Sequence, residues 1–437
     1  MRVLRRIGIA VLLCLPAVAS GFETTEDVLW PESGRFPGYP AETDPRRVQF
    51  SVSGGLYHDD NIFRLSDSAV VPGVTERSDT IYRVGLGLKA DLPVSRQRLL
   101  FDANIDNFTF DRYSQLDHVA YRAGAAWRWQ VGSRLSGDLG YARRRFLADL
   151  GEIQASLKDM ITEDRFYANA GFLVTPRWRV RGGADWVKWD HSESTRSVLD
   201  LRVSSTTVGV DYVTPASNSI GAQFKYSHGD YPNRQVFAAG AVLNDYDEYE
   251  TSAVLRWMLT GKTVFNARLG YTKREHDELP ARDFDGFTGR LTLDWAAGAK
   301  TLINASVWRE IQSVEERGTL AEGGALEQAA ASYVLSTGAS IGPAWAPTVK
   351  LVFQAKLVHE KRKFEGDPGL AFGVFSIPGA AGAHREDTFN GIRVSAGYTP
   401  IRALRLTLSA ERGERDSNAL LRDYDYNRIS ANARFQF

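Results

Sequence analysis

The sequence predicts an all-β fold: a transmembrane antiparallel up-and-down β-barrel of about 18 strands, with both termini periplasmic. Three observations lead to this prediction. The segment 425–437 alternates apolar and polar residues and stops on an aromatic residue. Short and long connections alternate along the chain. Beyond the N-terminal region, no apolar run reaches the length of about 18 residues that a membrane-spanning helix needs.

The segment 425–437 is the clearest expected strand. Phe435 and Phe437 share one face with alanines, whereas Arg434 and Gln436 lie on the other. Successive side chains of a strand point to opposite faces, so this segment has an apolar face and a polar face. A soluble β-sandwich strand has the same alternation. An aromatic residue at the last position is typical of the closing strand of a bacterial outer-membrane barrel.

Interior segments repeat the alternation, for example at 265–272, 290–295 and 404–411. An arginine turned toward lipid at mid-membrane costs about 2–4 kcal/mol, so the polar faces must line the lumen. The lumen arginines expected to contact a transported molecule are Arg268, Arg290, Arg405 and Arg428.

Eighteen such segments are separated by turn signals. The connections after even-numbered strands are short, and those after odd-numbered strands are mostly longer and more polar, as in barrels with periplasmic turns and outer loops. The expected strands are 47–57, 80–92, 97–112, 117–130, 133–147, 162–175, 177–190, 197–214, 218–229, 246–259, 262–276, 284–296, 300–313, 328–343, 348–364, 386–399, 402–415 and 425–437.

The N-terminal region has the features of a secretory signal peptide. Arginines precede a short apolar stretch at 7–15, and small residues follow, so cleavage is expected after Ala19 or, alternatively, after Ser20. The only cysteine, Cys14, lies in the apolar stretch, so the mature chain forms no disulfide. The expected domains are the signal peptide 1–19, a Pro-rich periplasmic segment 20–46 and the outer-membrane barrel 47–437.

Tryptophans mark the ends of many expected strands, which fits aromatic belts at the two membrane interfaces. Trp189 and Trp308 are expected near the outer interface. The tryptophans expected near the periplasmic interface are Trp127, Trp178, Trp257, Trp295 and Trp345.

The composition limits the kinds of binding partner to expect. Basic and acidic residues number 53 each, so nothing favours nucleic acid. The seven histidines show no metal-ligand spacing, and neither a metal nor a cofactor is expected. Membrane lipid, lipopolysaccharide and the barrel-assembly machinery are the partners that an outer-membrane barrel implies.

Several short polar and aromatic segments form a recognisable set: 57–65, 77–80, 121–123, 127–130, 229–235, 282–284 and 289–291. Together they resemble the EpsL-type outer-membrane proteins of exopolysaccharide biosynthesis, a family of beta-barrel porins. The resemblance implies a role in exopolysaccharide secretion, with polysaccharide and periplasmic export components as partners, and it supplies no catalytic residue.

The resulting hypothesis is a conduit for polysaccharide, with weak contacts along a polar lumen. A surface lectin with a plugged lumen is the alternative. An outer-membrane lipid- or polymer-modifying enzyme is a further one, although no Gly-x-Ser-x-Gly motif is present and the chain is not expected to be an enzyme. A Ser/His/acid set assembled from distant strands stays possible in any barrel.

Two polar clusters near the outer rim are candidate polysaccharide contacts. The first comprises Asp59, Asp60, Asn61 and Arg64, which either bind sugar hydroxyls or a cation, or simply form the turn after the first strand. The second comprises Asp230, Tyr231 and Arg234, which either stack on and grip a sugar acid or order their own loop.

Overall fold

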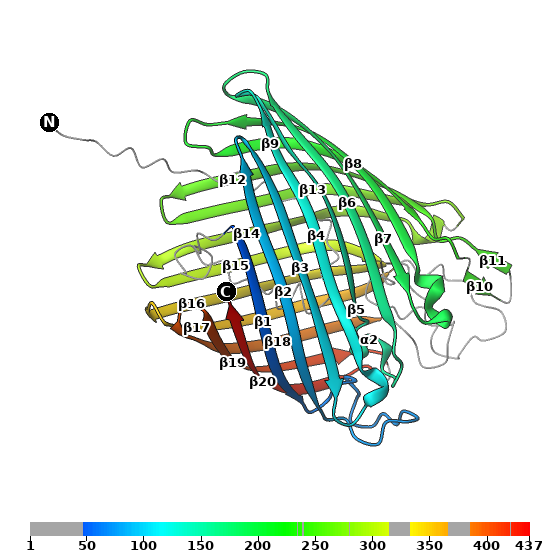
Figure 1. Ribbon diagram of the computed structural model, residues 1–437. Coiled ribbons are helices and arrows are strands. Elements are labelled where there is room, and N and C mark those ends of the chain that lie inside the picture. Colours follow the sequence, from blue (N-terminus) through cyan, green and yellow to red (C-terminus); the bar gives the residue numbers. More distant parts are fainter. Residues whose placement is uncertain are drawn as a thin grey trace.

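The computed structural model describes residues 47–437, apart from 234, 238–239, 279, 314–332, 366–384 and 420. The expected signal peptide and periplasmic segment therefore lie outside the described residues, and those two domain assignments stay predictions. The described chain forms one closed antiparallel barrel with an 18-stranded sheet, as expected from the alternation (Figure 1). Each strand of the wall pairs with its neighbours in the chain.

The first half of the wall consists of β1 (Val48–Asp59), β2 (Asp79–Val94), β3 (Gln97–Phe110), β4 (His118–Val131), β5 (Leu135–Leu147), β6 (Met160–Leu173), β7 (Trp178–His191), β8 (Leu201–Val213) and β9 (Ser219–Asp230). The second half consists of β12 (Tyr246–Thr260), β13 (Thr263–His276), β14 (Phe284–Gly298), β15 (Thr301–Ser313), β16 (Tyr333–Thr348), β17 (Leu351–Glu365), β18 (Glu386–Ile401), β19 (Leu404–Ser417) and β20 (Tyr424–Gln436). A separate hairpin, β10 (Gln235–Phe237) with β11 (Gly240–Val242), connects β9 to β12.

The barrel closes because β1 pairs with both β2 and β20. At the seam, the backbone N–H groups of Phe50 and Phe437 each donate to the other residue's carbonyl oxygen at 2.9 Å. Their rings stack with centroids 6.0 Å apart. A closed sheet has no edge strand, so every wall strand has a partner on both sides.

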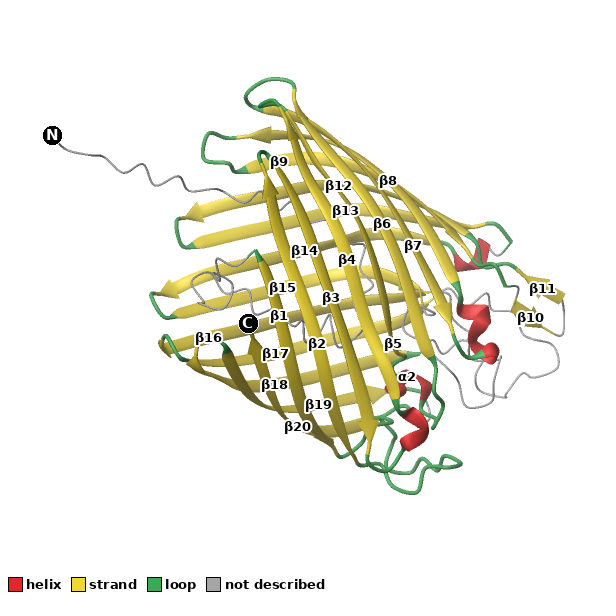
Figure 2. Ribbon diagram, in the orientation of Figure 1, coloured by secondary structure: helices red, strands yellow, loops and turns green. Residues whose placement is uncertain are grey.

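The two ends of the barrel differ as the connection lengths predicted (Figure 2). Short turns at one end join β2 to β3, β4 to β5 and the later even-to-odd pairs, and Gly132 occupies a left-handed turn position with φ of 61°. The other end, called the outer end below, carries the longer connections. These include α2 (Leu150–Ile153) and three 3-10 turns, η2 (Ser114–Leu116), η3 (Ser194–Leu199) and η4 (Pro280–Arg282).

The wall has an apolar outside and a polar inside. Val84, Leu408 and Ile429 point outward with exposed fractions of 62%, 57% and 58%, whereas Gln223 and Ser430 point inward and are buried. A continuous exposed apolar band is a liability in water and the requirement for contact with lipid. No helix in the described ranges has the length and apolarity of a transmembrane segment. The chain is an outer-membrane β-barrel.

The structure corrects the expected outer tryptophan belt. Trp189 and Trp308 face the lumen rather than lipid, and each is 6% exposed. Their indole N–H groups donate to Glu163 Oε2 and Ser336 Oγ, both at 2.9 Å. The sequence placed both residues at the correct height but on the wrong face, because a strand reverses its facing direction at every residue.

Two strand boundaries are also corrected. The strand expected from 197 begins at Leu201, because the Glu193 side chain accepts a hydrogen bond from the Thr195 backbone N–H and starts the turn η3. The strand expected to end at 343 continues to Thr348, because Ala344, Trp345 and Thr348 pair with β17 across a register shift.

Candidate functional site

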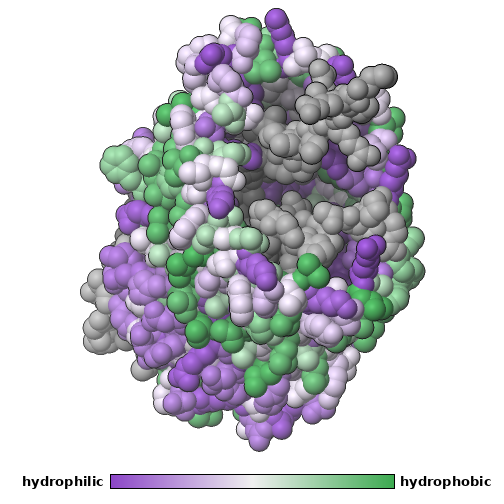
Figure 3. All heavy atoms as spheres, turned by 90° about the vertical axis from the view of Figure 1, so that its left-hand side faces the viewer, coloured by the Kyte–Doolittle hydropathy of each residue, from purple (hydrophilic) through white to green (hydrophobic). Residues whose placement is uncertain are grey.

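The lumen face carries charges of both signs that pair across neighbouring strands. Figure 3 looks onto the short-turn end, which is hollowed, with hydrophilic side chains visible in the hollow. Arg165 on β6 pairs with Asp185 on β7 at 2.7 Å, and Arg179 on β7 pairs with Asp211 on β8 at 2.7 Å. The charge segregation expected from the alternation is therefore present, and opposite charges are in direct contact.

Arg268 and Arg290 belong to one of these chains of ion pairs. They face each other across β13 and β14, a like-charge contact that costs energy by itself. Glu310 on β15 contacts both, at 2.9 Å from Arg268 and 2.6 Å from Arg290, and Glu250 on β12 contacts Arg268 at 2.6 Å. The carboxylates on the flanking strands thus offset the repulsion and hold the two arginines against the wall.

Asp59, Arg64 and Arg428 form a second network at the outer end of the lumen. Asp59 is fully buried and contacts Arg64 at 2.7 Å and Arg428 at 2.8 Å. The Arg64 guanidinium lies 3.4 Å from the centroid of the Tyr426 ring, a cation–π arrangement. The residues come from β1, the following loop and β20, so the network also ties the barrel seam.

Asp60 and Asn61 order the turn between that loop and β20. Asp60 accepts hydrogen bonds from the backbone and side-chain nitrogens of Asn427 at 2.7 and 2.8 Å. The Asn61 amide donates to the carbonyl oxygens of Leu65 and Asp425 at 2.9 and 3.0 Å. These hydrogen bonds are the ones expected if Asp60 and Asn61 form the turn after the first strand rather than bind a sugar or a cation.

The remaining expected contact residues lie in different surroundings. Tyr231 is 1% exposed and packs in an apolar cluster with Trp189 and Tyr246. Asp230 pairs with Arg202 at 3.5 Å on the outside of the wall, and Arg234 lies outside the described residues. Arg405 lies on the lumen side of β19, in register with Arg434 of β20. The structure therefore gathers Asp59, Asp60, Asn61, Arg64 and Arg428 at the seam and brings Arg268 and Arg290 together elsewhere on the wall. It separates both groups from Asp230, Tyr231 and Arg405.

The loop 148–159 after β5 is a feature that the sequence did not reveal. Asp149 caps α2 by accepting a hydrogen bond from the Gly151 N–H at 2.8 Å, and Gln154 ends the helix in a left-handed conformation, with φ of 50°. Leu150 and Ile153 are buried in two separate apolar clusters at the outer end. A single helical turn is therefore packed on both flanks.

Glu152 of α2 reaches the far wall of the barrel. Its carboxylate lies 2.8 Å from Arg415, 3.4 Å from Arg362 and 3.6 Å from Arg385, and the Arg422 guanidinium donates to its carbonyl oxygen at 3.2 Å. Burial alone raises the pKa of Glu152, but the surrounding guanidinium groups outweigh burial and lower it to about 2.

This contact crosses the lumen. Strands β4, β3, β2, β1 and β20 lie between β5, which carries α2, and β19, which carries Arg415. Figure 1 shows α2 at the outer end, beside the end of β5. The loop therefore spans part of the outer mouth and narrows it. No sequence signal marks this contact, because Glu152 and Arg415 are 263 positions apart.

The other end of the same loop is anchored by Asp159, which is fully buried. Its carboxylate contacts His191 and Arg196, both at 2.7 Å, and accepts the backbone N–H groups of Ser192 and Glu193 at 3.1 and 3.2 Å. Burial raises the pKa of Asp159, but the hydrogen bond from His191 and the charge of Arg196 lower it to about 2. The loop is thus clamped through two buried carboxylates.

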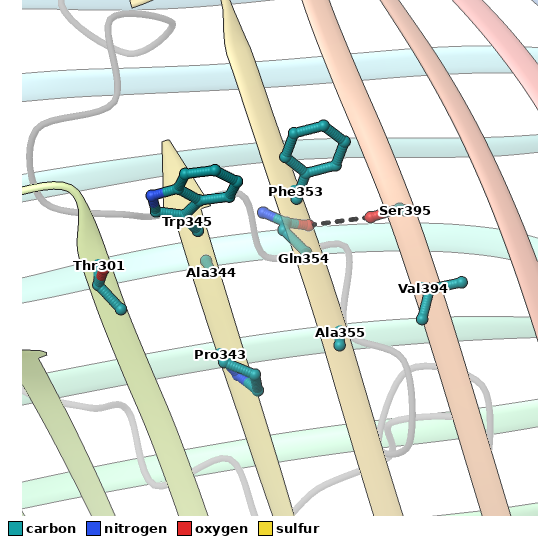
Figure 4. A pocket seen from close by; sticks show the side chains of 9 residues that line it. All are labelled: Thr301, Pro343, Ala344, Trp345, Phe353, Gln354, Ala355, Val394 and Ser395. Carbon is teal, nitrogen blue, oxygen red and sulfur yellow. Dashed lines mark hydrogen bonds between the residues drawn. The ribbon is translucent and has the colours of Figure 1, made fainter. Parts of the chain in front are cut away.

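A pocket on the wall is a separate feature (Figure 4). It is lined by Trp345, Phe353 and Val394 on the lipid-facing side of β16 to β18, and the two aromatic rings stack with centroids 5.8 Å apart. Its apolar lining suits contact with an acyl chain and does not belong to the lumen.

Comparisons with known proteins add the following findings. No family model matches the chain, and no curated protein matches it. Similar solved structures include OpdK of Pseudomonas aeruginosa with vanillate, at 11% identity and a TM-score of 0.45 over 89% of this chain and 99% of that chain. Another is a BenF-like porin from Pseudomonas fluorescens Pf-5, at 10% identity and a TM-score of 0.43 over 89% and 99%.

The resemblance to the EpsL-type exopolysaccharide proteins is corrected by these findings. No family model matches the chain, and the similar solved structures include an outer membrane protein and a BenF-like porin. Segments 57–65, 77–80 and 282–284 lie in or beside outer loops, where polar turn residues recur in many barrels for local reasons, whereas 121–123 and 289–291 lie within strands β4 and β14. The chain is an 18-stranded outer-membrane barrel with an inward-folded loop clamped across its outer mouth.

Proposed function

We propose that this protein is a passive channel for small hydrophilic solutes, narrowed at its outer mouth by the loop 148–159. The observation that carries the proposal is the contact of Glu152 with Arg415 and its neighbours across a closed, polar-lined barrel. Barrels of about 16–18 strands leave an aqueous interior. A loop held across that interior limits the size of what passes and leaves the rest of the lumen open to water.

The lumen wall suits transient contacts. Its arginines and carboxylates are held in pairs such as Arg268–Glu310 and Arg165–Asp185. A passing polar solute exchanges hydrogen bonds with such pairs without meeting one dominant charge, and many weak contacts permit passage where one tight site would stall it. The proposed activity needs no catalytic group and no cofactor.

Planar-bilayer recording tests this proposal. The purified full chain is expected to give stepwise conductance, and liposomes containing it should swell faster in monosaccharides than in large oligosaccharides. Replacing residues 150–156 by a Gly-Ser linker should increase the step size and relax the size limit. Folded barrels, verified by heat-dependent gel mobility, that show no conductance would overturn the channel and favour the surface lectin with a plugged lumen.

The polymer conduit expected from the sequence depended on the family resemblance. With that resemblance corrected, the inward-folded loop favours a small solute over a chain-like one. The candidate polysaccharide contacts Asp59 and Asp60 bind residues of their own loop and of β20. Their side chains therefore stabilise the seam rather than favour a polysaccharide ligand.

A further inference from the structure

A serine, a histidine and an aspartate, the residue types of a hydrolase triad, lie in one row on the outside of the wall. Ser204 of β8 is the register partner of His228 of β9, and His228 is the register partner of Asp247 of β12. Paired residues of neighbouring strands point to the same face of a sheet. That face is the lipid-facing one. Val208 lies on the same face of β8 as Ser204, and Phe224 lies on the same face of β9 as His228. Both point outward, with exposed fractions of 53% and 41%.

The histidine and the aspartate are already joined. His228 Nδ1 lies 2.9 Å from Asp247 Oδ1, and the Tyr226 hydroxyl donates to the same oxygen at 2.7 Å. With Nδ1 directed at Asp247 on β12, Nε2 is the ring nitrogen that would serve as the base toward Ser204 on β8. The side chains of His228 and Asp247 are 45% and 32% exposed, so the pair is accessible from outside the barrel.

Ser204 occupies the position of a nucleophile. It is exposed, and side chains directly opposite in an antiparallel pair have Cβ atoms about 4.5–5.5 Å apart. Rotation about the serine Cα–Cβ bond can turn its hydroxyl toward the neighbouring strand that carries His228. Nucleophile–base hydrogen bonds are often long in the free enzyme and tighten when substrate binds.

The aromatic neighbours of the row indicate that it lies near the membrane–water interface. Trp186 of β7 is the register partner of Ser204, and Tyr226 and Tyr249 pair with each other one step closer to the membrane centre. Tryptophan and tyrosine rings of this kind mark the membrane–water interface. Acyl esters of membrane lipids occupy the same interface, between the hydrocarbon chains and the head groups.

A positive charge lies next to the proposed nucleophile. Arg202 precedes Ser204 by two positions and therefore lies on the same face of β8, and its side chain is 46% exposed. Its guanidinium is 3.5 Å from Asp230 in the structure. The N–H groups of a guanidinium can donate to an oxyanion that develops beside the serine, where backbone N–H groups are engaged in the sheet.

We propose that Ser204, His228 and Asp247 form a serine-hydrolase triad that cleaves fatty-acyl esters of outer-leaflet lipids. Ser204 Oγ attacks the ester carbonyl carbon while His228 Nε2 takes the hydroxyl proton, and Asp247 stabilises the imidazolium. The tetrahedral intermediate collapses, and the alcohol leaves with the proton from His228. Water then attacks the acyl-serine by the same route and releases the fatty acid, so one ester and one water give an alcohol and an acid.

The test uses the full-length protein in vesicles of two kinds. One kind contains phosphatidylethanolamine and phosphatidylglycerol, and the other contains lipopolysaccharide, so the acids released identify the source of the ester. We expect release by the wild-type protein and a loss of about 100-fold or more in Ser204→Ala and His228→Gln, the usual scale for a nucleophile–base pair. Heat-dependent gel mobility verifies that each variant forms a barrel.

A matched control exists on the same surface. His359 of β17 accepts or donates a 2.8 Å hydrogen bond with Asn390 of β18 through Nδ1, but its partner on β16 is Ala339, which has no hydroxyl. His359→Gln should hydrolyse esters like the wild-type protein. Equal loss of ester hydrolysis in His359→Gln and His228→Gln would overturn the assignment, because the loss would then come from a general effect on the barrel wall.

A fluorophosphonate probe supplies a readout besides turnover. It should label the wild-type protein at Ser204, identified by mass spectrometry, and fail to label Ser204→Ala and His228→Gln. No labelling and no acid release by the folded wild-type barrel would mean that the row is only a polar rim of the wall. Channel conductance in the same variants should be unchanged, because the row lies outside the lumen.

Discussion

At the scale of single residues, the most consequential side chain is Glu152. It is 2% exposed and lies among Arg362 of β17, Arg415 of β19 and Arg385, which directly precedes β18. A buried charge is tolerated only with partners of opposite sign, and removing one partner leaves the others uncompensated. The carboxylate therefore holds the loop against the wall and keeps the arginines in place at the same time.

We predict that Glu152→Gln weakens this clamp by about 3–5 kcal/mol, the usual scale for breaking a buried ion pair. The loop should then leave the lumen more often, which is measurable as larger or noisier conductance steps and as faster proteolysis within 148–159. Glu76→Gln is the control, because Glu76 is an exposed loop residue paired with Arg112. Equal effects of the two changes would show that Glu152 does not restrain the loop.

At the scale of elements, the loop 148–159 acts as one unit with two carboxylate anchors. Asp149 and Gln154 define its helical turn, Leu150 and Ile153 pack its flanks, and Glu152 and Asp159 fasten it. The pKa of each anchor is lowered to about 2, from 4.5 for Glu152 and 3.8 for Asp159. A carboxyl with a lowered pKa in the folded state stabilises that state while it is ionised.

The sign of the pH dependence follows from these shifts. The stabilisation by Glu152 and Asp159 is fully present above about pH 4.5 and is lost progressively as the pH falls toward 2, because both carboxylates then become protonated. We predict that conductance is constant from pH 7 to 5 and rises between pH 4 and 2. The linker variant that lacks residues 150–156 should lack the part of this rise that Glu152 causes. An unchanged wild-type conductance at pH 3 would contradict the role of the anchors.

At the scale of the whole molecule, closure joins the first and last strands. Phe437 exchanges two backbone hydrogen bonds with Phe50, and its ring lies 6.0 Å from the rings of both Phe50 and Phe435. The Asp59 network adds ion pairs between β1, its following loop and β20 at the opposite end of the same seam. The seam is thus fastened at both ends of the barrel.

We predict that deleting Phe437 reduces the amount of heat-modifiable barrel in the outer membrane several-fold. The change removes two backbone hydrogen bonds, each contributing about 0.5–1.5 kcal/mol, together with the aromatic contact at the seam. Gln436→Ser is the control, because Gln436 faces the lumen and its backbone stays in place. Similar membrane levels of both variants would show that Phe437 has no role in barrel assembly.

The fold was largely predictable because its determinants are local. Alternation with a period of two, visible at 404–411 and 425–437, defines a strand with one lipid face and one wet face wherever it occurs. Connection lengths then order the strands into a meander. The errors at Trp189 and Trp308 arose where polar and apolar residues mix near the outer end, so that a shift of one residue assigns the opposite face.

The sites were less predictable because they depend on register and on crossing the barrel. The sequence by itself determined an outer-membrane barrel, its strand number and a charged lumen, since each follows from the pattern within single strands. Only the tertiary structure decided that Glu152 meets Arg415 across the mouth and that Ser204, His228 and Asp247 share one row. The physical reason is that cross-strand pairing and loop docking join residues far apart in the chain, and alternation within a strand carries no information about which residue of the next strand lies opposite.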